Sequence, residues 1–388
     1  MKNKKSITIA HLHVWDKKNK GDVAIVLAVQ ELLRQHFPEA KIIDYPVSLL
    51  KTGGAVEAKK INQADFIVIG GGGIFYSYFL PYSQKFIKQL KKPIIIFGAG
   101  YIREVGAPAL SKAAASSVAY LAKQAILVGV RDDNTKKFLI DHGLAAEKIE
   151  VVGDPALVLS EQAPQEEVLK KLALAKGDII PARDLSQGQA KLALQKKKNT
   201  ASPIRIGLNL NYSGWLGFGK WQDDILGAYQ AVIDYFQETY GGETGPGVEF
   251  YYLKHHPGES RIYPKLKIKN RHLVNLKPGE QKYVYGRLDL VIGMMLHVGV
   301  MAFGAETPQI SVAYDLRNYS FAEYVKLPEL VISLEDLSQG ALLARAQEVF
   351  KKRKKYGIIF KLRKRQIADR QAEFLIKAKK VLKSFKSD

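Results

Sequence analysis

Short apolar runs recur along the chain and alternate with stretches of helical spacing. Such alternation of strand-like and helix-like segments is typical of parallel α/β sheets. The first half predicts strands near residues 6–12, 40–44, 65–69, 93–97, 126–130 and 149–152. The second half predicts strands near residues 204–210, 248–253, 272–276, 288–292, 309–313 and 330–333. The clearest helix is residues 22–36, where apolar side chains return at helical intervals.

The length of 388 residues predicts two domains rather than one core. The fold class expected from the alternation is α/β, with two Rossmann-like domains facing across a cleft. Residues 161–203 are rich in Gln, Lys and Ala and contain three prolines, which indicates a linker or insertion. The predicted organisation is an N-terminal Rossmann-like domain (1–160), this linker (161–203), a C-terminal Rossmann-like domain (204–350) and a basic amphipathic helix (351–388).

Composition narrows the class of protein. Hydrophobic residues make up 47% of the chain, enough for a folded globular protein. There are no cysteines, which excludes disulfides and thiolate chemistry and is consistent with a cytoplasmic protein. The N-terminus is expected to be a first strand rather than a signal peptide. Since no segment approaches ~20 uninterrupted apolar residues, we expect a soluble or peripheral protein.

The net charge of +21 is concentrated at the C-terminus, where residues 351–388 hold fifteen Lys or Arg against three Asp or Glu. Such a field favours anionic partners such as phosphates or acidic lipid. Apolar residues on one face of this segment, from Ile367 to Phe385, predict an amphipathic helix. That helix is expected to pack against the domains or to lie on an anionic membrane surface at the inner face of the membrane. A solvated basic helix is the simpler alternative.

Polar and glycine residues follow the predicted strands of the first half, at the edge where parallel sheets bind ligands. Asn19, Gly21 and Asp22 begin the first helix, and we regard them as substrate-binding candidates. Asp22 is alternatively only a helix cap. The third strand is expected to end in four glycines, and Gly71, Gly72 and Gly73 would expose backbone amides to a phosphate or carboxylate.

Arg131 follows the fifth strand and stands directly before a helix capped by Asp132 or Asp133. A guanidinium there can bind an anion bidentately, and the helix amides add positive potential. The alternative is a salt bridge between Arg131 and its own aspartate neighbours.

The second half has the same pattern of polar residues after strands. The substrate-binding candidates there are Asn209, Lys254, His256, Tyr314 and Arg317. His255 and His256 are adjacent and would point to opposite sides of a strand, so the pair does not predict a metal site. No metal is expected.

His297 lies where an apolar strand gives way to a small-residue helix in the sequence GMMLHVGVMAFG. A histidine that titrates near neutrality can supply or relay a proton. The alternative is a satisfied cap or core residue.

Four stretches together resemble the polysaccharide pyruvyl transferase family. They are N-x-G-D at Asn19–Asp22, the run of four glycines, V-R-D-D-N at Val130–Asn134 followed by G-D-P, and L-H-x-x-x-x-A-F-G-x-x-x-P at Leu296–Pro308 leading to Y-D-x-R. The resemblance covers most of the chain and is weakest over residues 161–203. It implies a fold like that of the GT-B glycosyltransferases.

The resemblance further implies phosphoenolpyruvate as donor substrate, with no separate cofactor. The acceptor would be a sugar hydroxyl of a cell-surface polysaccharide or of its lipid-linked precursor, and the product a pyruvate ketal. The family's arginine and histidine map onto Arg131 and His297, which we treat as the catalytic candidates. The family usually has an arginine where Met295 stands, so Arg317, Lys254 or another basic group would have to replace its charge.

Two other functions remain open from the sequence. One is a GT-B glycosyltransferase that uses a nucleotide sugar, with the Lys254–Pro257 stretch binding the diphosphate. The other is a surface-binding or nucleic-acid-binding protein driven by the basic tail. No nucleic-acid partner is expected, because no stretch resembles an RNA or DNA module.

Overall fold

The computed structural model describes residues 7–104, 107–174, 202–211, 218–242 and 245–385. Contacts between Cα atoms divide the chain into two units. The first unit comprises residues 1–160, 315–328 and 362–388. The second unit comprises residues 161–314 and 329–361.

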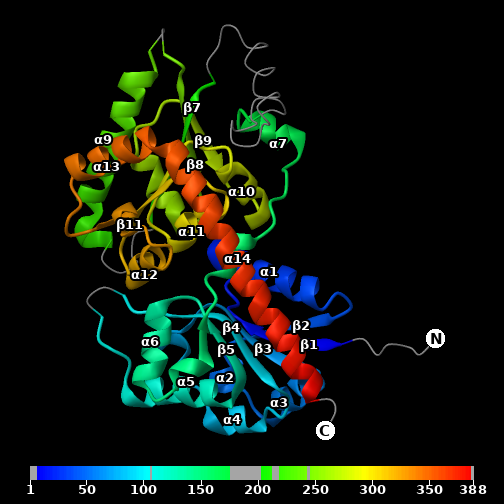
Figure 1. Cartoon of the computed structure of the whole chain (residues 1–388). Helices are drawn as coiled ribbons and strands as arrows, with labels where there is room; N and C mark the ends of the chain where they lie inside the picture. The colour runs from blue at the N-terminus through cyan, green and yellow to red at the C-terminus, as the bar shows by residue number, and fades with distance from the viewer. Residues whose placement is uncertain (1–6, 105–106, 175–201, 212–217, 243–244, 386–388) are drawn as a thin grey trace. The chain divides into compact units, whose positions relative to one another are not determined.

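The first unit contains a six-stranded sheet in the order β2-β1-β3-β4-β5-β6, in which every pairing is parallel. The central strands β3 and β4 are buried over nearly their whole length, because helices cover a parallel sheet on both faces (Figure 1). The strands are β1 (Thr8–His13), β2 (Lys41–Pro46), β3 (Phe66–Phe75), β4 (Ile94–Tyr101), β5 (Ala125–Val130) and β6 (Ile149–Val151).

The helices of the first unit follow these strands in alternation. They are α1 (Lys20–His36), α2 (Leu49–Thr52), α3 (Ala55–Ile61), α4 (Gln84–Gln89), α5 (Lys112–Gln124), α6 (Asp133–Asp141) and α12 (Leu316–Tyr324), with short 3₁₀ turns η1 (Ser77–Phe79), η2 (Ala146–Lys148) and η3 (Pro155–Val158). Helix α12 comes from a distant part of the chain. The Asn134 side chain of α6 donates a hydrogen bond to Ser320 Oγ of α12 at 2.6 Å, which ties the two helices together.

The second unit contains another six-stranded parallel sheet, in the order β12-β11-β10-β7-β8-β9. Counted from β7, this is the Rossmann order 3-2-1-4-5-6, with a topological switch point between β7 and β10. The strands are β7 (Ile204–Asn209), β8 (Val248–Leu253), β9 (Arg271–Val274), β10 (Leu290–Gly293), β11 (Gln309–Ala313) and β12 (Val331–Ser333).

The helices of the second unit include α7, which lies in the segment that the sequence assigned to a linker. They are α7 (Glu166–Lys171), α9 (Phe218–Tyr240), α10 (Pro278–Tyr285), α11 (Leu296–Gly304) and α13 (Gln339–Lys351), with 3₁₀ turns η4 (Pro257–Arg261), η5 (Tyr263–Lys265) and η6 (Pro328–Leu330). Leu169 and Leu172 of the α7 segment are buried, and Tyr251 Oη donates a hydrogen bond to the Leu172 carbonyl. Residues 161–174 therefore pack on the second unit, while residues 175–201 lie outside the described part.

The predicted C-terminal helix is α14 (Arg353–Ser384), and it belongs to both units. Its second half packs on the first sheet, where Phe374 stacks on Phe97 with ring centroids 5.5 Å apart. Leu375 and Leu382 join the same buried cluster as Val29 of α1. The apolar stripe is thus core as expected, except that Phe385 is 53% exposed.

This division differs from the predicted domain bounds in two places. The predicted C-terminal domain runs without interruption from residue 204 to 350, whereas residues 315–328 belong to the first unit. The predicted tail is likewise shared, since residues 362–388 belong to the first unit and the start of α14 to the second. Sequence periodicity locates elements but does not show which distant elements pack together.

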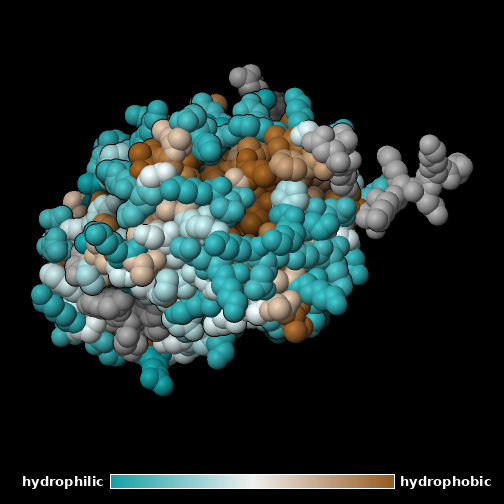
Figure 2. Space-filling view, turned by 90° about the horizontal axis from the view of Figure 1, so that it is seen from below, coloured by the Kyte–Doolittle hydropathy of each residue, from teal (hydrophilic) through white to brown (hydrophobic). Residues whose placement is uncertain are grey.

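Hydrophilic side chains cover most of the face drawn in Figure 2, and apolar residues gather in one area of it. Among the described residues, no helix combines the length and apolar character that crossing a membrane requires.

Candidate functional site

Arg131 directly follows β5 at the carboxyl edge of the first sheet, where the sequence predicted an anion-binding arginine. It is buried, with 4% of its surface exposed. Its Nε donates to Asp132 Oδ2 at 3.3 Å, and its Nη1 lies 3.7 Å from Asp154 Oδ2. Among the described residues, neither Nη1 nor Nη2 has a hydrogen-bond partner. The predicted local salt bridge is therefore present, yet it leaves the two buried terminal nitrogens of the guanidinium without a hydrogen bond. Such nitrogens can donate two parallel hydrogen bonds to an anion.

Two capping aspartates orient this arginine. Asp132 is the N-cap of α6, and its Oδ1 accepts from both the Thr135 backbone N–H and the Thr135 hydroxyl at 2.7 Å. Asp154 caps η3 by accepting from the Ala156 N–H at 2.9 Å. Burial raises the pKa of Asp154, and the neighbouring charge of Arg131 opposes that shift. Each carboxylate is held by a helix start and so presents its second oxygen to Arg131.

Asp22 lies within electrostatic reach of two arginines of the same unit. Burial raises the pKa of this half-buried carboxyl to about 7. The positive charges of Arg317 and Arg131 lower this pKa, and the negative charges of Asp16 and Asp154 raise it. The predicted cap role is wrong for Asp22, because Asn19 is the N-cap of α1 and accepts from the Gly21 N–H at 3.0 Å. Asp22 therefore does not cap the helix, and its carboxyl lies within the field of the two arginines.

Arg317 reaches this edge because α12 is part of the first unit. Asp315 is the N-cap of α12, and its Oδ1 accepts from the Arg317 N–H at 2.7 Å. The Arg317 Nε donates to the other oxygen of Asp315 at 2.8 Å. Asp315 also forms a backbone bridge with Glu104, which fixes the start of α12 against the segment after β4.

Tyr76 and Glu104 lie near Arg317 and Asp315, and sequence reasoning missed both. The Tyr76 hydroxyl donates to Glu104 Oε1 at 2.5 Å, and burial together with Glu104 raises the pKa of Tyr76. The charge of Arg317 lowers the pKa of Tyr76, which puts Tyr76 in the same electrostatic neighbourhood. The one sequence signal for Tyr76 is that it closely follows the glycine run, from which only Ile74 and Phe75 separate it.

The glycine run does not end the third strand, as the sequence predicted, but lies inside β3. Gly71 and Gly72 have positive φ values of 79° and 110°, which favour glycine. A Cβ on Gly73 would lie 2.0 Å from Ile102 Cδ1. Close packing and backbone conformation thus explain the run within the first unit, and anion binding by Gly71, Gly72 and Gly73 stays a prediction.

His297 of the second unit lies in the first turn of α11, where β10 gives way to the helix at the switch point of this sheet. It is buried, with 7% of its surface exposed. The turn is held by Asn209 at the end of β7, whose Oδ1 accepts from the Met295 N–H at 3.2 Å. The Asn209 amide group donates to the Leu253 carbonyl at 2.9 Å and to Glu259 Oε2 at 3.1 Å. Asn209 therefore positions the turn that carries His297.

The Lys254–Pro257 stretch is engaged in its own turn. His256 caps η4, and its Nδ1 accepts from the Gly258 N–H at 3.0 Å. Glu259 Oε1 accepts from the backbone N–H groups of His255 and His256, at 3.0 and 2.6 Å. Lys254 donates to Ser260 Oγ at 2.6 Å. Glu259, fully buried, is the residue that sequence reasoning missed here, and the H-x-x-E spacing of a capping box was its signal.

Tyr314 directly follows β11 and is buried, with 7% of its surface exposed. It is the last residue of its segment of the second unit, and Asp315 begins the segment that belongs to the first. Arg131 and His297 belong to different units, and their action on one donor molecule stays a prediction.

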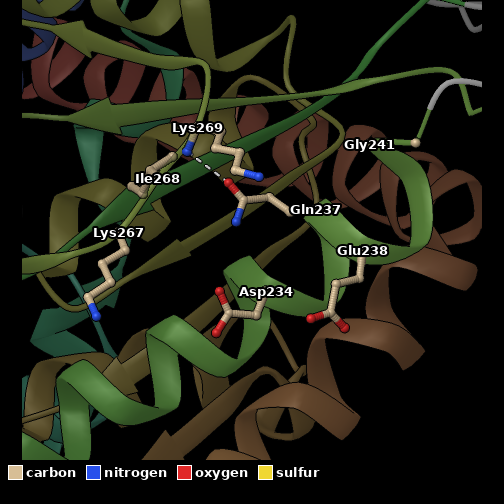
Figure 3. A pocket seen from close by; sticks show the side chains of 8 residues that line it. Asp234, Gln237, Glu238, Gly241, Lys267, Ile268 and Lys269 are labelled. Atoms are coloured by element: carbon tan, nitrogen blue, oxygen red, sulfur yellow. Dashed lines mark hydrogen bonds between the residues drawn. The ribbon is translucent and has the colours of Figure 1, made fainter.

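A pocket of about 700 Å³ lies on the second unit between the end of α9 and the loop before β9 (Figure 3). Charged side chains line it, and the Lys269 N–H donates to Gln237 Oε1 at 2.8 Å within it. It borders the loops that precede β8 and β9, at the amino end of the strands. Ligands of such sheets bind at the carboxyl end, so this pocket is not the candidate site.

Solved structures that resemble the chain share its fold at low sequence identity. A putative UDP-N-acetylglucosamine 2-epimerase from Listeria monocytogenes has a TM-score of 0.54 at 13% identity, over 92% of this chain and 90% of that one. Anabaena Alr3699/HepE in complex with UDP-glucose has a TM-score of 0.52 at 14% identity, over 97% and 100%. The S. aureus MnaA–UDP structure has a TM-score of 0.52 at 10% identity, over 92% and 91%. These similarities establish the two-domain, GT-B-like fold.

None of the curated proteins compared with the chain matches it. The chain does match the sequence model of one family, which is described as polysaccharide pyruvyl transferase. The match extends from Asn19, the cap of α1, to Asp315, the cap of α12, and so spans the residues that surround Arg131. Because the matched residues 19–315 are well over half of its length, the chain belongs to the polysaccharide pyruvyl transferase family and is a transferase enzyme.

Proposed function

We propose that the enzyme transfers the pyruvyl group of phosphoenolpyruvate to a sugar hydroxyl and forms a pyruvate ketal. Membership of the family supports the transfer of pyruvyl to a polysaccharide. The observation that carries the choice of donor is Arg131, a buried arginine whose outer nitrogens have no hydrogen-bond partner among the described residues. A guanidinium in this state is suited to a carboxylate or a phosphate, which it can bind through two parallel hydrogen bonds.

Phosphoenolpyruvate carries two anionic groups, and a donor site therefore needs more than one cation. Arg317 is the second cation of this neighbourhood, because its charge and that of Arg131 both act on Asp22. Met295 stands where the family usually has an arginine, and Arg317 would replace the positive charge that is absent there. We propose that Arg131 and Arg317 share the carboxylate and the phosphate of the donor between them.

The reaction requires that one proton be added to a carbon atom of the donor. Protonation of the donor's methylene carbon makes a methyl group and leaves the adjacent carbon oxocarbenium-like. One sugar hydroxyl forms a C–O bond to that carbon, a second hydroxyl forms another, and the bond to phosphate breaks. One hydroxyl proton is accounted for by the new methyl group and the other leaves with the phosphate, so the products are the ketal and inorganic phosphate.

The chain's own groups would assist two of these events. Arginines stabilise the charge that develops on the departing phosphate, a contribution that a prepositioned cation makes without reorganisation. His297 is the proposed proton donor, because an imidazole can both give and accept a proton near neutral pH. Asn209, which holds the preceding turn through the Met295 N–H, is then a positioning residue.

The test is donor binding followed by turnover. Titration of the full chain with phosphoenolpyruvate in a calorimeter is expected to show one site. Arg131→Lys should weaken that binding about 10- to 100-fold, because hydrogen bonds to a charged group contribute roughly 1.5–3 kcal/mol. Arg271→Lys, at an exposed arginine of β9, is the matched control and should bind as the unchanged chain does.

Turnover is measured as phosphate release with lipid-linked and polysaccharide acceptors. No heat of binding together with no phosphate release from any acceptor would contradict the proposal. A thermal shift with UDP-glucose but none with phosphoenolpyruvate would favour a nucleotide-sugar transferase instead. No further cofactor is part of the proposal, and the acceptor would be a cell-surface polysaccharide or its lipid-linked precursor.

A further inference from the structure

Two histidines and an aspartate meet near the carboxyl end of β1, where the sequence predicted no metal. His11 and His13 alternate with apolar residues in AHLHV and therefore point to the same face of the strand. Asp44 of β2 lies directly opposite His11 in the register of the two strands. The nearest nitrogen or oxygen atoms of these three side chains all lie within 4.8 Å of one another.

The hydrogen bonds of each ring decide which nitrogen carries the proton. His11 Nε2 lies 3.2 Å from the Gly70 carbonyl, and His13 Nδ1 is hydrogen-bonded to the Val14 carbonyl. A carbonyl only accepts, so each of these nitrogens donates an N–H. The opposite nitrogens, His11 Nδ1 and His13 Nε2, then carry the lone pairs when the rings are neutral.

Both of these nitrogens lie near one carboxylate oxygen. Asp44 Oδ1 lies 3.9 Å from His11 Nδ1 and 3.1 Å from His13 Nε2. Two lone pairs and an anionic oxygen at these distances repel one another unless positive charge lies among them. A proton on His13 Nε2 would satisfy that contact but would leave the fully buried His11 Nδ1 without a partner among the described residues. A metal cation satisfies all three atoms at once.

We propose that His11, His13 and Asp44 bind a divalent first-row transition metal, with Zn²⁺ as the reference ion. Zn²⁺ takes nitrogen and oxygen ligands at about 2.1 Å, which places tetrahedral ligand atoms about 3.4 Å apart. The two separations from Asp44 Oδ1, 3.1 and 3.9 Å, lie on either side of that value. Imidazole and carboxylate are ligands that such metals accept. Three protein ligands leave a fourth position for water or for an oxygen of another molecule.

The surrounding contacts are those that metal ligands need. A ligating histidine usually donates its second N–H to a carbonyl or carboxylate, which fixes the tautomer and the ring. Both His11 and His13 do so. The Gln30 side chain of α1 donates to Asp44 Oδ1 at 2.7 Å and orients the carboxylate. Trp15 stacks on the His13 ring, with centroids 5.2 Å apart, and covers its outer face.

The location gives the metal a consequence for the enzyme. It would join β1 to β2 just before the loop that leads to Asn19, the cap of α1. The Asp44 side chain is 41% exposed, so the site has access to solvent. Binding should therefore be reversible and should stiffen the start of this loop. This inference does not depend on the proposed donor.

The experiment uses the full chain, freed of metal by a chelator and then titrated with Zn²⁺ alone. We expect one equivalent to bind and the melting temperature to rise with Zn²⁺, because a ligand that binds only the folded state stabilises it. Co²⁺ in place of Zn²⁺ should give the visible ligand-field absorption of a tetrahedral site. Asp44→Asn and His13→Gln each remove one ligand and should weaken Zn²⁺ binding by more than about 100-fold.

Gln30→Ala tests the positioning contact and should weaken Zn²⁺ binding about 10- to 100-fold. His36→Gln, on the last turn of α1, is the control histidine and should leave both affinity and Co²⁺ spectrum unchanged. If the unchanged chain binds no Zn²⁺, or if Asp44→Asn and His13→Gln bind it as tightly, the inference is overturned and a protonated His13 paired with Asp44 explains the cluster.

Discussion

A Cβ atom on Gly100 would lie 2.6 Å from Cζ of Arg131. Real Cβ atoms do not approach so closely, and the guanidinium therefore occupies its buried place only because residue 100 has no side chain. Gly100 is the residue before the end of β4 at Tyr101, and it is in this sense part of the arginine's site.

Gly100→Ala is expected to displace the Arg131 side chain and to weaken phosphoenolpyruvate binding by at least about 10-fold, because hydrogen bonds to a charged group are worth roughly 1.5–3 kcal/mol. Calorimetric titration measures the affinity, and chemical denaturation measures the accompanying loss of stability. Gly340→Ala is the matched control, since a Cβ there meets nothing within 4 Å. Unchanged donor affinity in a folded Gly100→Ala protein would show that Arg131 does not bind the donor.

Asp22 should make the folded state less stable as pH rises, because its carboxyl has a raised pKa. Its pKa in the folded chain is about 7, against 3.8 for an ordinary aspartate. The folded state therefore holds the proton more tightly, and this stabilisation is present at low pH and is lost as pH rises from about 4 to about 7. Because the side chain is half-buried, we expect an effect on the order of 2 kcal/mol rather than the full linkage value.

The measurement is denaturation of the unchanged chain and of Asp22→Asn at pH 5 and pH 8. The amide does not titrate, so the unchanged chain should lose more stability between the two pH values than the variant does. An equal pH dependence of the two proteins would mean that the carboxyl of Asp22 titrates at its ordinary pKa.

Two substitutions of Asn209 should destabilise the protein by different amounts. Asn209→Ala removes the acceptor of the Met295 N–H and both donors, and should cost about 1–3 kcal/mol because buried groups are left unsatisfied. Asn209→Asp should cost more, because a carboxylate would then face Glu259 at the distance of the present hydrogen bond, 3.1 Å. Urea denaturation gives both values. A milder effect of aspartate than of alanine would contradict this account of the turn before His297.

Helix α14 offers a matched pair of phenylalanines. Phe374 is buried, stacks on Phe97 and packs against Gly129, so Phe374→Ala should cost about 3–5 kcal/mol. Phe385 is 53% exposed, and Phe385→Ala should change stability by no more than about 0.5 kcal/mol. Thermal denaturation compares the two. Similar effects of both substitutions would mean that the helix does not dock as described.

The apolar stripe for which the sequence predicted a membrane contact is mostly buried, so we now propose that the exposed side of α14 makes that contact. Ile358 and Leu362 are 63% and 62% exposed and lie one helical turn apart among lysines and arginines. Since deletion of the helix would remove Phe374 from the core, the point variants Ile358→Ser and Leu362→Ser are the suitable test. Together they should reduce sedimentation with vesicles rich in phosphatidylserine, and high salt should reduce it further. Binding that is unaffected by both would exclude this face.

The sequence by itself determined where the elements lie. Buried parallel strands need uninterrupted apolar runs and their helices need one apolar face, so β3, β5, β8 and α1 could be located from local pattern alone. Arg131 was found as a polar residue directly after a strand, and His297 as a polar residue in an apolar stretch where a strand gives way to a helix. Their roles in donor binding and proton transfer stay predictions.

Only the tertiary structure decided which distant residues meet. Glu104 bridges to Asp315 and Asn134 binds Ser320, so Arg317 belongs to the same unit as Arg131. Asp44 reaches His11 and His13 only through the register of β1 on β2. The physical reason is that strand order, register and helix docking are set by side-chain packing across the whole unit, whereas the periodicity of a segment reflects only whether its own faces are buried.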